Sequence, residues 1–284
     1  MRKITVLFFG GLGNQLFQLA LAKSLKKKYI DFDLELIDLT SYSKVKREWS
    51  LGFLGLKGKK INKFQYFLLR LKIFINKKSF KFGLKNNIFN IIDESHYSKF
   101  LLKKVSNKSF MMDGYWQSEK YFYDYKDEIK SFILRNQESM GNLKKKHENV
   151  ALHIRLGDYK DFKTSKENHL VCDLSWYVKA VNFLFSKNDN LEFIIFTDDQ
   201  NYIRSNFKLP NFIKYSITEQ SSEPYIDMLK MSYCRHFIIS NSSYSWWASY
   251  LGEDCNSFVV APKYWYPKKL TSKLEICRSN WILL

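Results

Sequence analysis

Short apolar runs that end in small or polar residues recur along the chain, and stretches with helical spacing separate them. Beyond residue 149 this alternation is regular. Strands are predicted at 150–154, 193–197, 212–217, 237–240 and 258–261, and helices near 174–186, 199–206, 224–233 and 244–251. Apolar runs without polar alternation are typical of strands that helices cover on both faces. The repeated strand–helix order therefore predicts an α/β domain with a mostly parallel sheet.

The beginning of the chain shows the same order of elements. Residues 4–28 predict a buried strand, a glycine turn and a helix, which is how a Rossmann-like domain begins. A dinucleotide-binding fingerprint is incomplete here, because Asn14 and the residues after it supply no third glycine. Gly11 and Gly13 then allow either the close approach of a ligand to the backbone or a tight strand-to-helix turn.

A change in composition near the middle of the chain predicts two domains. Before it, further elements are predicted as strands at 34–37 and 110–112 and as a helix that ends near residue 134. Residues 136–149 are rich in Asn, Lys, Glu and Gly, which is typical of an interdomain linker. We therefore expect an N-terminal domain at 1–140 and a C-terminal domain at 141–284.

Apolar residues at helical spacing predict a further helix at 61–75. The apolar positions are Phe64, Phe67, Leu68, Leu71, Phe74 and Ile75, and the basic positions around them are Lys60, Lys63, Arg70, Lys72, Lys77 and Lys78. We expect the apolar face to pack against the core of its domain. The alternative is a helix that lies on a membrane surface, because its polar positions are basic.

Composition narrows the classes of partner. The chain has 284 residues, a formal net charge of +18 and a pI near 9.5, which favours a nucleic acid, a nucleotide donor or an anionic membrane as partner. Its four cysteines lie far apart in sequence and suggest neither a disulfide framework nor a zinc site. No apolar run has the length of a membrane span. We expect a cytoplasmic protein, with peripheral contact to the inner face of the plasma membrane as an open alternative.

Polar residues follow three predicted strands of the second half. His153 and Arg155 end the first, Asp198 and Asp199 follow the second, and Ser242 and Ser243 follow the fourth. The carboxyl ends of parallel strands meet at one edge of a sheet, where α/β proteins bind ligands. An Arg there fits phosphate oxygens, and Ser residues before a helix form an anion site at its positive end. These residues predict a nucleotide diphosphate site; ion pairing and helix capping are the structural alternatives.

Two other patterns are interpreted as structural. Trp246 and Trp247 are expected to pack a helix against the sheet rather than to touch a substrate. Asp31 and Asp33 have the spacing of acids that hold a metal on a nucleotide sugar, but they precede the strand at 34–37. We therefore expect them at the amino edge of the sheet, away from the ligand site.

Four segments closely resemble the α-1,2-fucosyltransferases of glycosyltransferase family 11. They are 10–18, 153–159, 196–199 and 241–247, in the family's order along the chain. The resemblance implies an α/β, GT-B-like fold: two Rossmann-like domains with a nucleotide-sugar cleft between them. It also implies an inverting transfer of L-fucose from GDP-fucose to the 2-hydroxyl of a terminal galactose, without a metal or another cofactor.

By the family pattern, the C-terminal domain holds GDP-fucose and the N-terminal domain holds the acceptor. Arg155 would contact the β-phosphate, His153 and Asp198 would lie around the guanosine, and Ser242 and Ser243 would meet the phosphates. The other donor-binding residues that we expect are Gly11, Gly13, Asn14 and Asn241.

The sequence departs from the family pattern at one position and leaves the catalytic base open. Many members carry a second Arg where Leu156 stands, and Leu156 should point away from Arg155 because neighbours on a strand face opposite sides. Either a base or the leaving phosphate accepts the proton of the galactose hydroxyl. The candidate bases are Asp158, Glu119 and Asp227. Of these, we assign Asp158 a catalytic role together with Arg155.

The expected acceptor is a galactose-terminated oligosaccharide or lipid-linked glycan of an O-antigen or another bacterial surface polysaccharide. A protein or N-acetylglucosamine-type acceptor is the alternative within the same chemistry, although relatives of that kind lack the run at 241–247 in this form. A basic nucleic-acid-binding module is the alternative from another class. No recognition motif supports it, so we expect no nucleic-acid partner.

Overall fold

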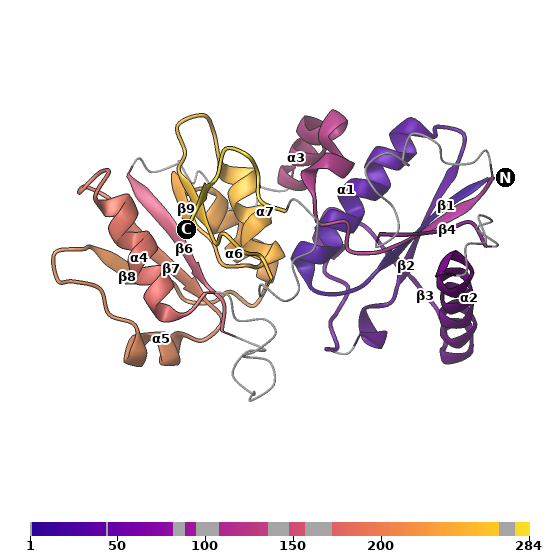
Figure 1. The fold of residues 1–284 in the computed structure, drawn as a ribbon, viewed down its shortest axis with the longest axis horizontal. Helices are drawn as coiled ribbons and strands as arrows, with labels where there is room; N and C mark the ends of the chain where they lie inside the picture. The colour runs from indigo at the N-terminus through magenta and orange to yellow at the C-terminus, as the bar shows by residue number, and fades with distance from the viewer. Residues whose placement is uncertain are drawn as a thin grey trace. The chain divides into compact units, whose positions relative to one another are not determined.

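The computed structural model describes residues 2–43, 45–81, 89–94, 108–135, 148–156, 172–266 and 276–284. The chain divides into two compact units, Met1–Ile133 and Leu134–Leu284, each with its own sheet (Figure 1). The boundary that we predicted between 140 and 141 lies outside the described residues.

The first unit contains a parallel five-stranded sheet in the order β3-β2-β1-β5-β4. Its elements are β1 (Lys3–Phe8), α1 (Leu12–Lys28), β2 (Asp33–Asp38), β3 (Lys59–Lys60), α2 (Lys63–Lys81), β4 (Ile91–Asp93), β5 (Phe110–Asp113) and α3 (Lys126–Leu134). The chain leaves β1 toward β2 and returns on the other side of β1 through β4 and β5. Because such crossovers are right-handed, α1 and α2 cover opposite faces of the sheet (Figure 1).

The second unit contains a parallel six-stranded sheet in the order β11-β10-β9-β6-β7-β8. Its elements are β6 (Asn149–Ile154), α4 (Leu174–Phe185), β7 (Glu192–Thr197), α5 (Gln200–Asn206), β8 (Tyr215–Ile217), α6 (Pro224–Ser232), β9 (His236–Ile238), α7 (Ser243–Gly252), β10 (Val259–Ala261) and β11 (Ile282–Leu283). The prediction of two Rossmann-like α/β domains, the architecture of the GT-B-like class, is confirmed.

The region before α3 differs from the prediction. Instead of one helix that runs to residue 134, two short 3₁₀ segments, Glu119–Tyr121 and Tyr123–Tyr125, precede α3. The first is capped by Ser118, whose Oγ accepts the backbone N–H of Lys120. Local hydrogen bonding of this kind competes with a continuous helix, so the helix begins only at α3.

Successive side chains of β6 point to opposite faces of the sheet and therefore have different neighbours. Val150, Leu152 and Ile154 belong to a buried cluster that includes residues of α4. His153 faces the other side of the sheet, where its ring lies 5.5 Å from that of Tyr244 on α7. The side of β6 that carries His153 is therefore the side on which α7 packs.

Two adjacent tryptophans hold α7 in the core of the second unit. Trp246 and Trp247 are both fully buried, and their rings pack with that of Tyr250. The indole N–H of Trp246 donates to the backbone oxygen of Ile276 over 2.8 Å. The prediction that these tryptophans pack the helix is confirmed.

The helix predicted at 61–75 is present as α2, but the prediction that its apolar face packs in the core is wrong. Leu69 and Ile73 make the core contact, together with Leu7 and Ile37 of β1 and β2. The residues expected in the core are all exposed instead: Phe64, Phe67, Leu68, Leu71, Phe74 and Ile75. The helix carries apolar residues on two faces, and periodicity alone does not tell which face meets the sheet.

Candidate active site

In each sheet, the first strands of the chain are added toward one edge of the sheet and the later strands toward the other edge. This switch point lies between β1 and β5 in the first unit and between β6 and β9 in the second. Open α/β sheets bind their ligands at the carboxyl ends of the strands beside such a point. In both units, polar residues singled out from the sequence lie in the segments that follow these strands.

An ion pair marks the carboxyl end of β6. The register of β6 and β7 pairs Ile154 with Thr197, so the residues that follow them, Arg155 and Asp198, lie side by side. Arg155 Nη1 is 2.8 Å from Asp198 Oδ2, and the backbone N–H of Leu156 donates to Asp198 Oδ1 over 2.8 Å. One carboxylate therefore fixes both the guanidinium and the backbone that follows it, through hydrogen bonds strengthened by charge.

The side chain of Leu156 lies on the face of the sheet opposite the Arg155–Asp198 ion pair. It packs against the same buried cluster as Ile154, on the side of α4. The prediction that Leu156 points away from Arg155 is confirmed, and this position supplies no second basic contact at the strand end.

His153 is buried two residues before Arg155. Its Nδ1 lies 3.0 Å from Ser240 Oγ, in the segment after β9. Burial lowers the pKa of the imidazole from its ordinary value near 6.5 to about 4; the Asp198 carboxylate opposes this shift and the Arg155 guanidinium adds to it. The ring is therefore neutral at pH 7, and His153 contributes hydrogen bonding and shape to the site rather than charge.

The segment after β9 leads into the N-terminus of α7. Ser242 is the N-cap, and its Oγ accepts the backbone N–H of Tyr244 over 3.3 Å; Ser243 is the first residue of the helix. The Asn241 amide donates to the backbone oxygen of Trp265 over 3.2 Å. Because β9 pairs with β6, this positive helix end lies at the same switch point as the ion pair.

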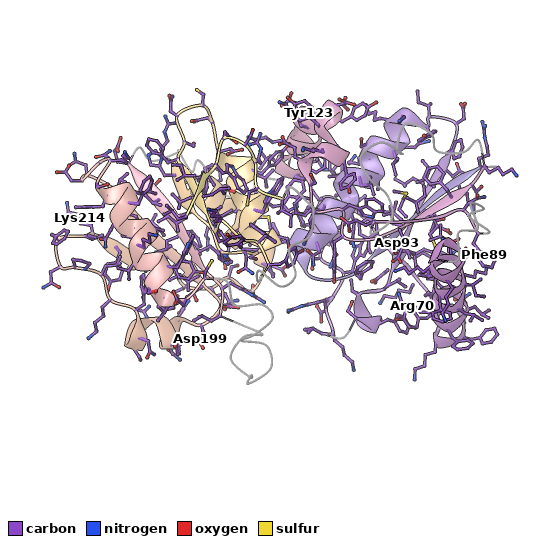
Figure 2. The ribbon with its side chains drawn as sticks, in the orientation of Figure 1. Arg70, Phe89, Asp93, Tyr123, Asp199 and Lys214 are labelled. Atoms are coloured by element: carbon purple, nitrogen blue, oxygen red, sulfur yellow. The ribbon has the colours of Figure 1, made fainter. Side chains whose placement is uncertain are left out.

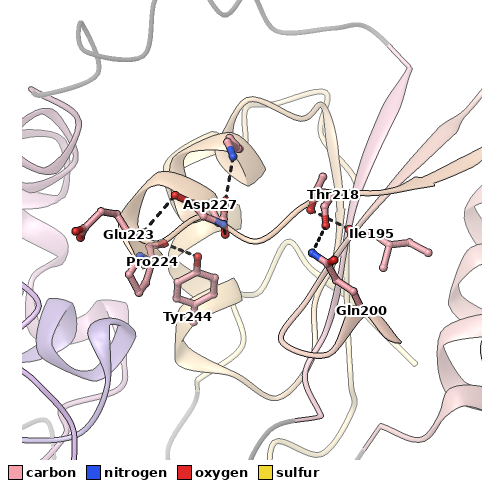
Figure 3. Close-up of polar contacts among 9 residues, drawn as sticks. Ile195, Gln200, Thr218, Glu223, Pro224, Asp227 and Tyr244 are labelled. Carbon is pink, nitrogen blue, oxygen red and sulfur yellow. Dashed lines mark hydrogen bonds and ion pairs between the residues drawn. The ribbon is translucent and has the colours of Figure 1, made fainter. Parts of the chain in front are cut away.

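The acids after β7 have separate tasks. Asp199, labelled in Figure 2, caps α5 by accepting the backbone N–H of Tyr202 over 2.9 Å, whereas Asp198 turns toward β6. Gln200 donates to the backbone oxygen of Thr218 over 2.8 Å, which ties the start of α5 to the loop after β8 (Figure 3). Sequence alone did not distinguish these two neighbouring acids.

The start of α6 is tied to α7 by polar contacts (Figure 3). Asp227 is buried; its Oδ2 accepts the backbone N–H of Ser221 over 2.8 Å and its Oδ1 lies 3.1 Å from Lys230 Nζ. The Tyr244 hydroxyl donates to the backbone oxygen of Pro224 over 2.6 Å, and burial raises the pKa of this phenol. Both oxygens of Asp227 are engaged within its own helix and loop, which favours a structural role over that of a base.

At the switch point of the first unit, the turn after β1 approaches the turn after β5. Gly10 has a φ of +83°, and a Cβ there would lie 2.5 Å from Asn14 Nδ2 and 3.1 Å from the Tyr115 ring. Asn14 Oδ1 accepts a hydrogen bond from Gln117 Nε2 over 2.7 Å. Only glycine fits this left-handed and crowded position. The close approach of the two turns that it allows lets Asn14 and Gln117 form their hydrogen bond.

Glu94, at the end of β4, was not found by sequence reasoning. Its Oε2 accepts the backbone N–H of Tyr115 over 2.7 Å, and a Cβ on Gly114 would lie 2.5 Å from Glu94 Cβ. Burial raises the pKa of this carboxyl, although the backbone N–H groups of Trp116, Tyr115 and Gln117 lower it. The carboxylate thus organises the turn that presents Gln117.

The residues predicted to form the site fall into two groups. Arg155, Asp198, His153 and the segment 241–243 meet at one sheet edge in the second unit. In the first unit, Gly11 is the N-cap of α1, and Gly13 and Asn14 lie in its first turn. Asp158 lies outside the described residues, so its catalytic role stays a prediction.

Possible metal ligands were sought across the described ranges. There, no three side chains of His, Cys, Asp or Glu gather where they could hold a metal ion. Asp31 lies 3.8 Å from Arg2 in an exposed ion pair, and Asp33 begins β2 opposite Lys3. Both acids are thus at the amino edge of the sheet, as predicted, and metal independence itself stays a prediction.

An Arg and a helix N-terminus at the switch point of a Rossmann-like domain form a site that suits an anion such as a diphosphate. Comparison with known families agrees, since the family described as Glycosyl transferase family 11 matches residues 3–284. The chain belongs to glycosyltransferase family 11.

Individual relatives resemble the chain over its whole length. An alpha-1,2-colitosyltransferase of Escherichia coli is 27% identical, with 96% of each chain covered. The O-antigen biosynthesis glycosyltransferase WbnK of Escherichia coli is 28% identical, with 97% of this chain and 98% of the relative covered. Among solved structures, Arabidopsis thaliana FUT1 in complex with GDP is 12% identical, with a TM-score of 0.47 over 93% of this chain and 70% of the other.

Proposed function

We propose that this chain transfers L-fucose from GDP-fucose to the 2-hydroxyl of a galactose at the end of a glycan. The observation that carries the proposal is the Arg155–Asp198 pair at the switch point beside the N-terminus of α7. The planar donor fork of a guanidinium suits phosphate oxygens. Helix N-termini favour the same kind of anion.

Each residue of the site has a task in this reaction. Arg155 stabilises the negative charge that develops on the β-phosphate, and Asp198 orients Arg155 through its ion pair. Ser242 and Ser243 at the start of α7 meet the phosphates. The neutral His153, whose Nδ1 lies 3.0 Å from Ser240 Oγ, lies near the guanosine.

The transfer is a single displacement at the anomeric carbon of fucose. The oxygen of the galactose 2-hydroxyl forms the new bond as the bond from that carbon to the β-phosphate oxygen breaks, and the configuration inverts. GDP leaves with the electron pair of the broken bond. The hydroxyl proton passes to a carboxylate, for which Asp158 is the proposed base, or to the leaving phosphate.

The first unit is the proposed acceptor side. Asn14, which the sequence analysis assigned to the donor, is hydrogen-bonded to Gln117 beside Tyr115. These amide groups and the aromatic ring lie at a switch point and suit sugar hydroxyls and a sugar face, so we now propose this pair for the acceptor. The O-antigen role in the name of the relative WbnK supports a bacterial surface glycan, free or linked to a lipid, as the acceptor.

A second candidate reaction has the same geometry but another donor sugar. The relative that is 27% identical over 96% of this chain is an alpha-1,2-colitosyltransferase. Colitose is the 3-deoxy form of L-fucose, so the two sugars differ in a single hydroxyl. Comparing the two donors with one acceptor decides between these candidates.

The decisive experiment measures acceptor-dependent release of GDP, corrected for hydrolysis. The donors are GDP-fucose and the corresponding colitose donor; the acceptors are lactose, N-acetyllactosamine and galactose-β-1,3-N-acetylhexosamine, with and without EDTA. We expect Arg155→Ala to lower kcat/KM by about 10²-fold or more, because a preorganised contact to developing charge is lost. Asp198→Asn should lower kcat/KM by about tenfold, because Arg155 loses a charged partner.

Arg235→Ala is the matched control. Arg235 forms an ion pair with Asp254 over 2.6 Å in the same unit, but it precedes β9 and so lies at the opposite edge of the sheet. We expect its kcat/KM to stay within about twofold of wild type. Equal losses in Arg155→Ala and Arg235→Ala, or no binding of either donor, would contradict the proposal. Binding of RNA that weakens steeply with salt would instead favour the nucleic-acid alternative.

A further inference from the structure

α2 presents a continuous apolar stripe on the face opposite the sheet. The stripe consists of six side chains that are between 38% and 68% exposed: Phe64, Phe67, Leu68, Leu71, Phe74 and Ile75. At 100° per residue, these positions occupy an arc of about 120°. The arc lies opposite Leu69 and Ile73, which are buried against the sheet. Exposed apolar residues that form one contiguous surface mark an interaction site.

The exposed stripe is not a sign of a loosely placed helix. Lys77 Nζ on α2 lies 2.5 Å from Asp93 Oδ2 and 3.5 Å from Asp113 Oδ2, at the ends of β4 and β5. The amide of Asn76 donates to the backbone oxygen of Ile91 over 3.1 Å within the buried contact. Buried polar contacts and the core contact of Leu69 thus fix the helix with its stripe outward.

The stretch of sequence that contains α2 is basic. Residues 49–92 contain no Asp or Glu and ten basic residues: Lys57, Lys59, Lys60, Lys63, Arg70, Lys72, Lys77, Lys78, Lys81 and Lys85. On the helical wheel Lys63 and Arg70 border one side of the stripe and Lys72 the other (Arg70 is labelled in Figure 2). Lys78 Nζ lies 5.2 Å from the centre of the Phe74 ring.

We propose that α2 docks the chain on an anionic lipid bilayer. The apolar stripe enters the boundary between headgroups and acyl chains, and the flanking Lys and Arg side chains lie at the level of the lipid phosphates. A second copy of the chain fits less well, because two such helices would bring positive charge against positive charge. A nucleic acid would match the charge but leave the phenyl rings of the stripe unmatched.

This surface belongs to the unit that we propose as the acceptor side. A glycan linked to a lipid lies at the bilayer surface, so docking through α2 would hold the chain where such an acceptor is found. The lipid interaction does not depend on the identity of the donor sugar, and its test requires no nucleotide sugar. Failure of the proposed transferase reaction and failure of the docking are therefore distinguishable.

Flotation with lipid vesicles tests the docking. The full chain is mixed with phosphatidylcholine vesicles, with or without phosphatidylglycerol, at low and at high ionic strength. We expect binding only to the anionic vesicles, and weaker binding at high salt. Phe67→Ser and Phe64→Ser should each lower the partition coefficient about tenfold, because each removes a ring from the apolar boundary. Arg70→Gln combined with Lys72→Gln should lower it on anionic vesicles.

Phe212→Ser is the matched control, because Phe212 is 68% exposed, as is Phe64, but lies in the second unit before β8. We expect it to bind vesicles like wild type. Thermal unfolding followed by circular dichroism verifies that each variant is folded. The docking is overturned if wild type does not bind anionic vesicles, or if Phe212→Ser weakens binding as much as Phe64→Ser. It is also overturned if sedimentation shows a dimer that Phe67→Ser dissociates while lipid binding is unchanged.

Discussion

At the scale of single residues, the site depends on partners that the sequence does not reveal. Apolar runs that end in Arg155, Asp198 and Ser242 predicted correctly that three strand ends meet at one sheet edge. The pairing of Arg155 with Asp198 depends on strand register, which no local pattern encodes. Glu94 was missed because it follows β4, a strand that the sequence analysis did not predict.

The buried neutral state of His153 predicts how stability depends on pH. Its pKa is about 4 in the folded chain and near 6.5 when unfolded, so the unfolded chain binds the proton first as pH falls. Stability from this group is complete above pH 6.5 and is lost progressively toward pH 4. Replacement by a residue that does not titrate removes this dependence.

Urea unfolding of wild type and His153→Gln at a series of pH values measures the effect. The difference between their free energies of unfolding should change between about pH 6.5 and pH 4 and stay constant above that window. Two stability curves that remain parallel through the window would show that His153 is not held neutral in the folded chain. Carboxyl groups that titrate in the same range contribute to both curves and cancel in the difference.

At the scale of helices and strands, most elements were predictable, including the three-residue strands β8, β9 and β10, whereas β3, β4 and β11 were not. The strand at 4–9 and the helix at 14–28 appear as β1 and α1 because their apolar patterns are long. β3 and β11, with two residues each, exist only through pairing with a neighbour. For α2 the pattern identified the helix but not its buried face, since Leu69 and Ile73 compete with an equally apolar opposite face.

The close approach of α6 and α7 predicts a position that tolerates only glycine. A Cβ on Gly252 would lie 2.2 Å from the backbone oxygen of Ser232 and 2.7 Å from the Phe237 ring. Backbone does not yield as a flexible side chain does, so Gly252→Ala should lower the free energy of unfolding by about 1–3 kcal/mol. Gly52→Ala is the control, because nothing lies within 4 Å of a Cβ there. Equal stability of the two variants would disprove the close approach.

At the scale of the whole molecule, the chain consists of two units with separate cores. The core cluster of residues such as Val150 and Leu152 lies wholly in the second unit, and that of Leu7 and Ile73 wholly in the first. The two-domain organisation followed from the composition of residues 136–149, whereas a position of the boundary at 140 remains a prediction.

Separate cores predict that GDP stabilises one unit selectively. The proposed phosphate contacts, Arg155 and Ser242 among them, all belong to the second unit. In differential scanning calorimetry we expect two unfolding transitions, and GDP should shift only one of them to higher temperature. At a GDP concentration a hundredfold above its Kd, the free energy of unfolding of that unit should increase by about 2.7 kcal/mol. An Arg155→Ala chain should keep both transitions but lose the shift. A single transition that moves as a whole with GDP would contradict this expectation.

The separation of the two sheets along the sequence has a consequence for folding during synthesis on the ribosome. Every strand of the first sheet precedes residue 114, and every strand of the second follows residue 148. Since a chain emerges with its N-terminal part first, the first sheet has all of its strands before the second sheet has any. Parallel strands form slowly and their open edges accept wrong partners. The order of synthesis keeps the strands of the two sheets from competing with one another.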